Sequence, residues 1–199
     1  KINFKKQISK KGSVNIVLFT DERFSIKPIK KYISNFEFSY ISDLLKNIDL
    51  KKKLLVFELS SKKKIVLVSI KKDIKAFEIE NLGAELYGII NNGKNSEYVI
   101  NTDSILGNGK IFIGHFLHGL KLKSYEFKKY KSKKETKLIT LNVFGKKNIP
   151  AINTLKKFKA LEEGTFYARD LVSEPGNILH PDEYARRLRS LKKYGLKIN

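Results

Sequence analysis

The amino-acid sequence predicts an α/β protein in which a mixed sheet of about five or six strands is sandwiched between helices and is followed by a long linking helix. Two observations predict this class. Short runs rich in Val, Ile, Leu and Phe alternate along the chain with stretches whose apolar residues recur at helical spacing. In addition, the chain has 199 residues, of which 41% are hydrophobic, so it can bury one sizeable core.

The strands are predicted from the short apolar runs. Residues 54–59 and 65–70 flank a lysine-rich connection at 60–64, and this spacing favours a hairpin within a mostly buried sheet. The four residues after Gly195 read as the start of a further strand. The expected strands are residues 14–19, 54–59, 65–70, 97–101, 138–144 and 196–199.

The helices are predicted from apolar residues at intervals of three and four. A long helix begins near Asn148, which can cap it, has Pro150 in its first turn, and ends at Pro175. We expect it to leave the sandwich, and a new helix to start at Pro181. Shorter helices are expected at residues 39–47, 76–90 and 113–120. The apolar stripe of the long helix is Ile152, Leu155, Phe158, Leu161, Ala168 and Val172.

Composition excludes several classes of protein. Cysteine is absent, which excludes disulfides, thiolate metal sites and cysteine nucleophiles. No apolar run approaches the roughly 18 residues of a membrane span, and the amino-terminal residues carry no signal-peptide pattern. We therefore expect a cytoplasmic protein without a membrane partner. Methionine is also absent, even at position 1, which favours either a lost initiator or a longer parent protein.

The formal charge of +21 is the main argument for nucleic-acid binding. Only five of the 41 basic residues are arginine, however, and lysine-rich faces are usually solvated surface. The best candidate site interleaves lysines with Tyr125, Phe127 and Tyr130, since aromatic rings can stack on bases. In the competing interpretation these rings anchor a helix end to the sheet. The candidate lysines are Lys128, Lys129, Lys131, Lys133 and Lys134.

Three further groups of polar residues have simpler structural explanations. Residues 107–114 join a strand to a helix, but their spacing fits neither the dinucleotide fingerprint nor the P-loop. His115 and His118 lie three apart and lack the further ligands that zinc requires, so partly buried structural histidines are favoured; His180 lies in a separate loop. Two pairs of adjacent carboxylates occur, Glu162–Glu163 and Asp182–Glu183. Adjacent side chains on a helix point in different directions, so neither pair forms an acid/base couple. The second pair follows Pro181, where acidic residues favour the start of a helix.

Residues 168–181, ARDLVSEPGNILHP, resemble the segment that opens the catalytic domain in the leucyl (cytosol) aminopeptidase family, where A-R-D-L-V-N-x-P-x-N-x-L-T-P is typical. The sequence departs from that pattern at Ser173, often Asn in the family, and at His180, often Thr. Upstream, residues 119–131, GLKLKSYEFKKYK, are similar to the family element G-x-x-L-x-S-Y-x-F-x-K-Y-K. The two motifs stand in the family's order, with a strand and a long helix between them.

This resemblance implies a specific organisation. In the family, an amino-terminal α/β domain that resembles the macro fold is tied by a long helix to a catalytic domain. That domain holds two divalent metals, Mn or Zn, between lysine, aspartate and glutamate ligands, and the parent enzymes are homohexamers that remove amino-terminal residues from peptides. The expected boundaries here are 1–147 for the amino-terminal domain, 148–174 for the linking helix and 175–199 for the truncated start of the catalytic domain.

No catalytic and no metal-binding residue is transferred to this chain. The family signatures F-D-S-G-G and N-T-D-A-E-G-R-L occur nowhere in the 199 residues. The chain alone is therefore expected to be inactive and to bind no metal cofactor. Two alternatives stay open: a nucleic-acid-binding α/β module, compatible with the DNA binding of some bacterial members, and a site for an ADP-ribose type ligand near residues 107–114.

Overall fold

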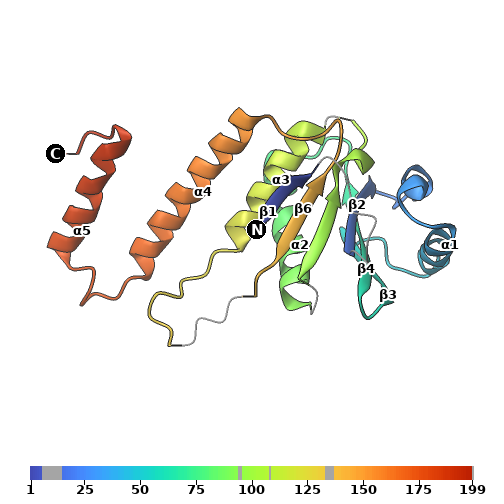
Figure 1. Cartoon of the computed structure of the whole chain (residues 1–199), viewed down its shortest axis with the longest axis horizontal. Helices are drawn as coiled ribbons and strands as arrows, with labels where there is room; N and C mark the ends of the chain where they lie inside the picture. Colours follow the sequence, from blue (N-terminus) through green and yellow to red (C-terminus); the bar gives the residue numbers. More distant parts are fainter. Residues whose placement is uncertain (6–14, 94–95, 108, 133–136, 199) are drawn as a thin grey trace.

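A six-stranded sheet lies between two layers of helices in the computed structural model, which describes residues 1–5, 15–93, 96–107, 109–132 and 137–198 (Figure 1). The strand order is β1-β6-β5-β2-β4-β3; β3 is antiparallel to its neighbour and the other pairs are parallel. The predicted mixed α/β sandwich is confirmed. The strands are β1 (Ile2–Lys5), β2 (Asn15–Asp21), β3 (Leu54–Ser60), β4 (Lys63–Ile70), β5 (Glu97–Asn101) and β6 (Thr140–Phe144).

The central strand β2 is buried on both faces. Val17 and Leu18 point to opposite faces of the sheet and both have no exposed surface. Because β2 has parallel neighbours on both sides and helices above and below, its residues form a continuous apolar run rather than an alternating one. Sequence reasoning missed β1, since its four residues alternate apolar and polar over too short a stretch.

The predicted hairpin forms between β3 and β4, with a shorter connection than expected. Lys63 and Lys64 belong to β4 rather than to the turn, so that two residues connect the strands. The Ser60 hydroxyl closes this turn by accepting the backbone N–H groups of Lys62 and Lys63 at 3.2 and 3.1 Å. Such side-chain bonds satisfy turn donors that have no partner in the sheet.

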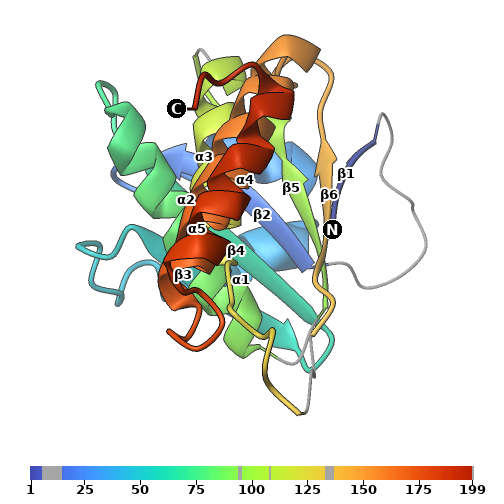
Figure 2. The ribbon, with the colours of Figure 1, turned by 90° about the vertical axis from the view of Figure 1, so that its left-hand side faces the viewer.

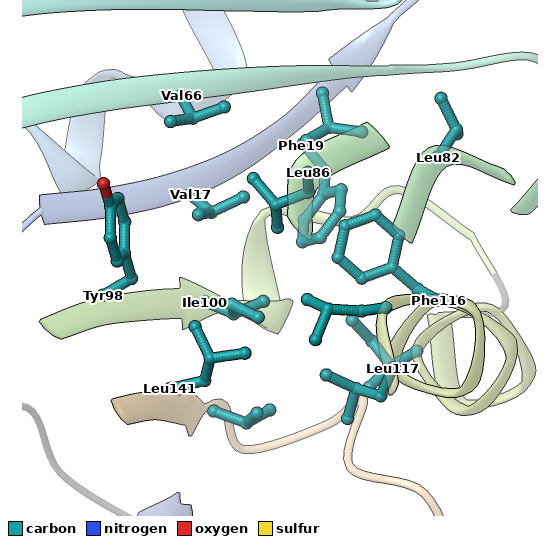
Figure 3. Close-up of a cluster of buried hydrophobic side chains, with 14 of the residues drawn as sticks. Val17, Phe19, Val66, Leu82, Leu86, Tyr98, Ile100, Phe116, Leu117 and Leu141 are labelled. Atoms are coloured by element: carbon teal, nitrogen blue, oxygen red, sulfur yellow. The ribbon is translucent and has the colours of Figure 1, made fainter. Parts of the chain in front are cut away.

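Helices cover both faces of the sheet. On one face, α2 (Ala76–Asn92) and α3 (Gly109–Lys123) enclose the larger core. The Phe19 ring lies nearly perpendicular to the rings of Phe112 and Phe116, at centroid distances of 5.4 and 5.3 Å. Figure 3 shows Phe19 and Phe116 in this core. On the other face, α1 (Asn35–Leu44) and the 3-10 helix η1 (Lys27–Tyr32) cover β2, β4 and β3. A second short 3-10 turn, η2 (Thr102–Ser104), follows β5.

Two glycines allow α2 and α3 to touch backbone to backbone. A Cβ at Gly83 would lie 2.0 Å from the carbonyl oxygen of Phe116, and one at Gly119 would lie 1.9 Å from the carbonyl oxygen of Glu80. Both distances are far below any real contact, so a larger residue at either position would separate the helices. Gly119 is also the first residue of the upstream motif, which gives that motif a packing role.

The helix α1 begins four residues earlier than predicted. Ser34 caps it: the Ser34 hydroxyl accepts the N–H of Glu37 at 3.2 Å, and the Glu37 carboxylate accepts the N–H of Ser34 at 2.8 Å. This reciprocal capping box defines the start of the helix. Phe38 continues the predicted stripe, three residues before Ile41, and packs on the core, whereas Phe36 in the first turn is 76% exposed. The start was therefore predicted too late because the capping residues Ser34 and Glu37 were not considered.

The long helix α4 (Ile152–Ser173) lies against α3 on the outside of the helical layer, and α5 (Pro181–Arg189) lies beyond it (Figures 1 and 2). The helix α4 begins later than predicted because Asn148 does not cap it. The Asn148 amide donates instead to the Thr102 carbonyl at 3.0 Å. The predicted apolar stripe is also wrong. Phe158 is buried, whereas Val172 is 88% exposed and Leu171, outside the stripe, is buried. One neighbouring helix covers only a narrow line of α4.

The strand expected at 196–199 is absent from the described part of this segment, residues 196–198. A 3-10 turn, η3 (Ser190–Tyr194), ends at Gly195 with φ of +85°, and the chain then continues without a sheet partner. A strand requires a neighbouring backbone to satisfy its hydrogen-bonding groups. Within the described ranges, no helix is both long and apolar enough to cross a membrane.

Candidate functional site

The two motifs that carry the family resemblance contact each other. Arg169 on α4 donates to the carbonyl of Leu122 at 2.9 Å, and its guanidinium lies 5.5 Å from the ring centre of Tyr125. The Tyr125 hydroxyl in turn donates to Asp170 at 2.7 Å. Residues far apart in the sequence therefore hold α4 against the end of α3. We call this set of contacts, with those of Glu174 and Arg187 below, the helix junction.

Glu174 is the centre of the helix junction. Its side chain is 1% exposed and accepts Lys129 Nζ at 2.5 Å, Arg187 Nη1 at 2.8 Å and the Tyr130 hydroxyl. These three donors, Lys129 foremost, hold the pKa of Glu174 at about 2. The carboxylate stays ionised throughout the physiological range, and it joins the upstream motif, the end of α4 and α5.

Arg187 fastens α5 to the same junction. Its backbone carbonyl accepts the Tyr167 hydroxyl at 2.9 Å, and its Nε donates to Glu183 at 2.8 Å. Glu183 also accepts two bonds from Arg186, at 2.6 and 2.7 Å. Bonding to Arg186 and Arg187 lowers the pKa of Glu183 to about 2. Pro181 does start a helix as predicted, but Glu183 binds arginines as well as lying in the first turn.

The lysine and aromatic cluster is largely engaged in contacts within the chain. Lys128 pairs with Glu126 and Lys129 pairs with Glu174. Tyr125 lies 5.3 Å from the ring of Phe166 on α4, so the aromatics anchor α4 rather than the sheet. Lys131 is exposed, whereas Lys133 and Lys134 lie outside the described residues. Nucleic-acid binding by this cluster stays a prediction.

The two neighbouring histidines bind carboxylates on different helices. His115 Nδ1 lies 2.8 Å from Glu80 Oε1 on α2, and His118 Nδ1 lies 3.1 Å from Glu162 Oε1 on α4. The ring of Phe158 contacts both imidazoles, at centroid distances of 5.0 and 4.8 Å. The predicted structural role is confirmed: these side chains join α2, α3 and α4.

Burial raises the pKa of Glu162, and the hydrogen bond to His118 opposes that rise. Its neighbour Glu163 is exposed and lies 3.7 Å from Lys159, so the adjacent carboxylates have separate partners, as predicted. His180 is exposed at the start of α5 and its side chain makes no capping bond. Among the described residues, no three His, Asp or Glu side chains are grouped so that they could hold a metal ion.

Two of the cavities that lie away from the helix junction are large enough for a small molecule. One, of about 600 Å³, is a cleft bordered by α2, α3, α4 and the β1–β6 side of the sheet. The other, of about 510 Å³, lies where β2 and β4 end, beside the chain that enters α3. In the predicted loop at 107–114, Gly107 has a φ of +88° and α3 begins at Gly109, while Asn108 is outside the described residues. The loop is a turn into a helix, as favoured; ADP-ribose binding stays a prediction.

Sequence reasoning missed the individual residues of the helix junction, although it identified the motifs that contain them. The motif at the end of α4 contains three charged residues that each bind a residue of the upstream motif: Arg169, Asp170 and Glu174. These residues could have been identified as candidates because they are charged and lie within the segment that resembles the family. Arg187 lies outside both motifs, and nothing in the sequence marks it.

Comparisons with known proteins agree with these observations. No protein-family model matches the chain. A probable cytosol aminopeptidase of Methylorubrum extorquens is 36% identical over 91 residues, which are 43% of this chain and 18% of that protein. One of Dinoroseobacter shibae is 31% identical over 135 residues, 68% of this chain and 26% of that protein. The chain thus spans about a quarter or less of these relatives.

The fold has close structural neighbours. A mutant form of tomato leucine aminopeptidase matches 98% of this chain and 42% of its own, with a TM-score of 0.72 and 16% identity. The bottromycin maturation enzyme BotP, in complex with Mn, matches 92% of this chain and 37% of its own, with a TM-score of 0.62 and 14% identity. By sequence similarity, with a fold that agrees, this chain is related to the part of the cytosol (leucyl) aminopeptidases with which it aligns.

Proposed function

We propose that the chain is the non-catalytic amino-terminal region and linking helix of a metal-dependent leucyl aminopeptidase, which removes amino-terminal residues from peptides. In this proposal the two divalent metals, Mn or Zn, and their ligands belong to a part of the parent protein outside these 199 residues. A cytoplasmic location and a homohexameric assembly are parts of the same proposal. The proposed boundaries are 1–147 for the domain, 148–174 for the linking segment that contains α4 and 175–199 for the start of the catalytic domain.

The helix junction is the observation that carries this proposal. Its contacts join the end of the amino-terminal domain to the end of α4, and Arg187 extends them to α5. A buried carboxylate that accepts three donors, as Glu174 does, fixes the relative orientation of the elements that supply the donors. Such a junction would place the following residues at a defined angle to the amino-terminal domain. The Mn in the BotP structure supports a divalent metal for the intact protein.

The absence of activity in the isolated chain can be tested directly. Purified chain is incubated with leucine p-nitroanilide and either Mn²⁺ or Zn²⁺, and the release of p-nitroaniline is measured. We expect none above the rate of a metal-containing blank. Metal-dependent release that rises with protein concentration and is removed by a chelator would refute the proposal.

A chimera tests the positive half of the proposal. The region of the Dinoroseobacter shibae relative that aligns with this chain is replaced by residues 1–199, and the aminopeptidase activity and oligomeric state of the chimera are measured. We expect a folded, active enzyme that Glu174→Gln impairs. The exposed Glu163→Gln is the matched control, because Glu163 makes one long surface contact. A folded chimera whose activity is equally insensitive to both substitutions would contradict the proposed role of the junction.

A further inference from the structure

The cavity of about 600 Å³ between α3, α4 and the sheet has the properties of a ligand site. Its size falls within the roughly 300–1,000 Å³ of typical small-molecule pockets. Apolar side chains of α2, α3 and α4 line it, together with those of β1, β6 and the chain before β6. The principal ones are Leu117, Leu120, Leu138, Leu141, Leu155 and Phe158.

The charged residues that line this cavity have a net positive charge. Two of them are acidic, Glu126 and Glu162, and each is already bonded to a base of the chain. Lys121 on α3 lies at the same rim, near enough to Glu162 to oppose the rise of the Glu162 pKa that burial causes. Lys159 on α4 and Lys137 line the cavity as well.

His118 supplies a fixed polar group in the wall. Its side chain is 8% exposed, it stacks on Phe158, and its Nδ1 is held by Glu162. A ring held by stacking and by one nitrogen cannot turn freely, so its other nitrogen keeps a constant direction. Largely apolar walls with a few oriented polar groups and an excess of cations suit a ligand that is apolar over most of its length and anionic at one end.

We propose that this cavity binds a small amphipathic monoanion, namely a carboxylate on an apolar chain, with the chain among the leucines and the carboxylate near Lys121. Since α3 and α4 both contribute walls, an occupant would contact the amino-terminal domain and the linking helix together. Binding would therefore strengthen the attachment of α4, because a ligand stabilises the state that holds both of its walls in place.

NMR of the purified chain tests this proposal with decanoate as the probe. The chain has three histidines, His115, His118 and His180, so their ring Hε1 signals can be assigned by substitution. We expect decanoate to shift the His118 signal saturably, and to leave the signal of the exposed His180 unchanged. Butyrate, which has the charge without the chain, and decanol, which has the chain without the charge, should each bind at least about tenfold more weakly.

A pair of variants separates the site from general attraction to a basic protein. Lys121→Gln should weaken decanoate binding about tenfold, as expected for the loss of one charge-assisted contact. Lys123→Gln removes the same charge from the same helix at a position that does not line the cavity, and should bind like the wild type. The proposal is overturned if decanoate leaves His118 unmoved, if decanol binds equally well, or if both variants weaken binding alike.

Discussion

Replacing Phe158 by alanine should detach the linking helix from the amino-terminal domain without unfolding the sheet. Phe158 is 9% exposed, and its ring contacts both His115 and His118 on α3. It also fills the space over Gly114, where a Cβ would lie 2.7 Å from the ring. Leu171 is the other apolar residue of α4 that is buried to this degree, and it lies near the far end of the helix.

The expected loss follows from the burial of this ring. Large-to-small substitutions of buried phenylalanine cost about 3–5 kcal/mol, and the lower end, about 3 kcal/mol, applies to a ring that packs against a single helix. Because the main contact of α4 is with α3, this loss should appear as local opening of α4. The open population of α4 should then rise by roughly a hundredfold.

Amide hydrogen exchange measures this opening. Protection should fall across α4 in Phe158→Ala, while the amides of the central strand β2 keep their wild-type exchange rates. Leu161→Ala is the matched control on the same helix; Leu161 is 49% exposed, so its loss should change protection by less than about 0.5 kcal/mol. Equal protection of α4 in the two variants would refute the claim that Phe158 attaches this helix.

Three further predictions concern other contacts. Gly119→Ala should destabilise the chain by about 1–3 kcal/mol in urea unfolding, because the new Cβ would lie 1.9 Å from the Glu80 carbonyl oxygen. Gly88→Ala is the control, since a Cβ at Gly88 has open space around it. Equal unfolding midpoints for the two variants would contradict the close contact between α2 and α3. The pKa of Glu174 is lowered from 4.5 to about 2, so its contribution to stability is present above pH 4.5 and is lost as the pH falls toward 2. The difference in unfolding free energy between wild type and Glu174→Gln should therefore close over that interval. A difference that does not depend on pH would count against the ion pairs. If the exposed Lys131 contacts DNA phosphates, Lys131→Gln should reduce the salt dependence of DNA binding; no binding at physiological salt would remove the nucleic-acid alternative.

Most of the sheet and the two core helices could be predicted from the sequence, because their patterns follow directly from burial. The runs around Val17 and Val66 are apolar because helices cover both faces of those strands, and the stripe of α2 is apolar because one face meets the sheet. The burial of α4 could not be predicted in this way. Its periodicity resembles that of a core helix, yet only a narrow line of it is covered, and Val172 is exposed.

The candidate site divides in the same manner. The motifs around Tyr125 and Arg169 could be identified in the sequence, and so could the structural role of His115 and His118. Their partners could not, because Glu80 and Glu162 lie 35 and 44 residues away along the chain. Pairing between such distant residues depends on how helices pack, and the sequence pattern carries no record of it.

The sequence by itself determined the class of the fold, the order of most strands and helices, and the resemblance to the aminopeptidase family. These depend on local periodicity and on short motifs, which are properties of neighbouring residues. Only the tertiary structure decided that the two motifs form one junction around Glu174, that the 125–131 aromatics anchor α4, and that residues 196–198 form no strand. Each of these depends on which distant surfaces are brought into contact, and close packing alone determines that.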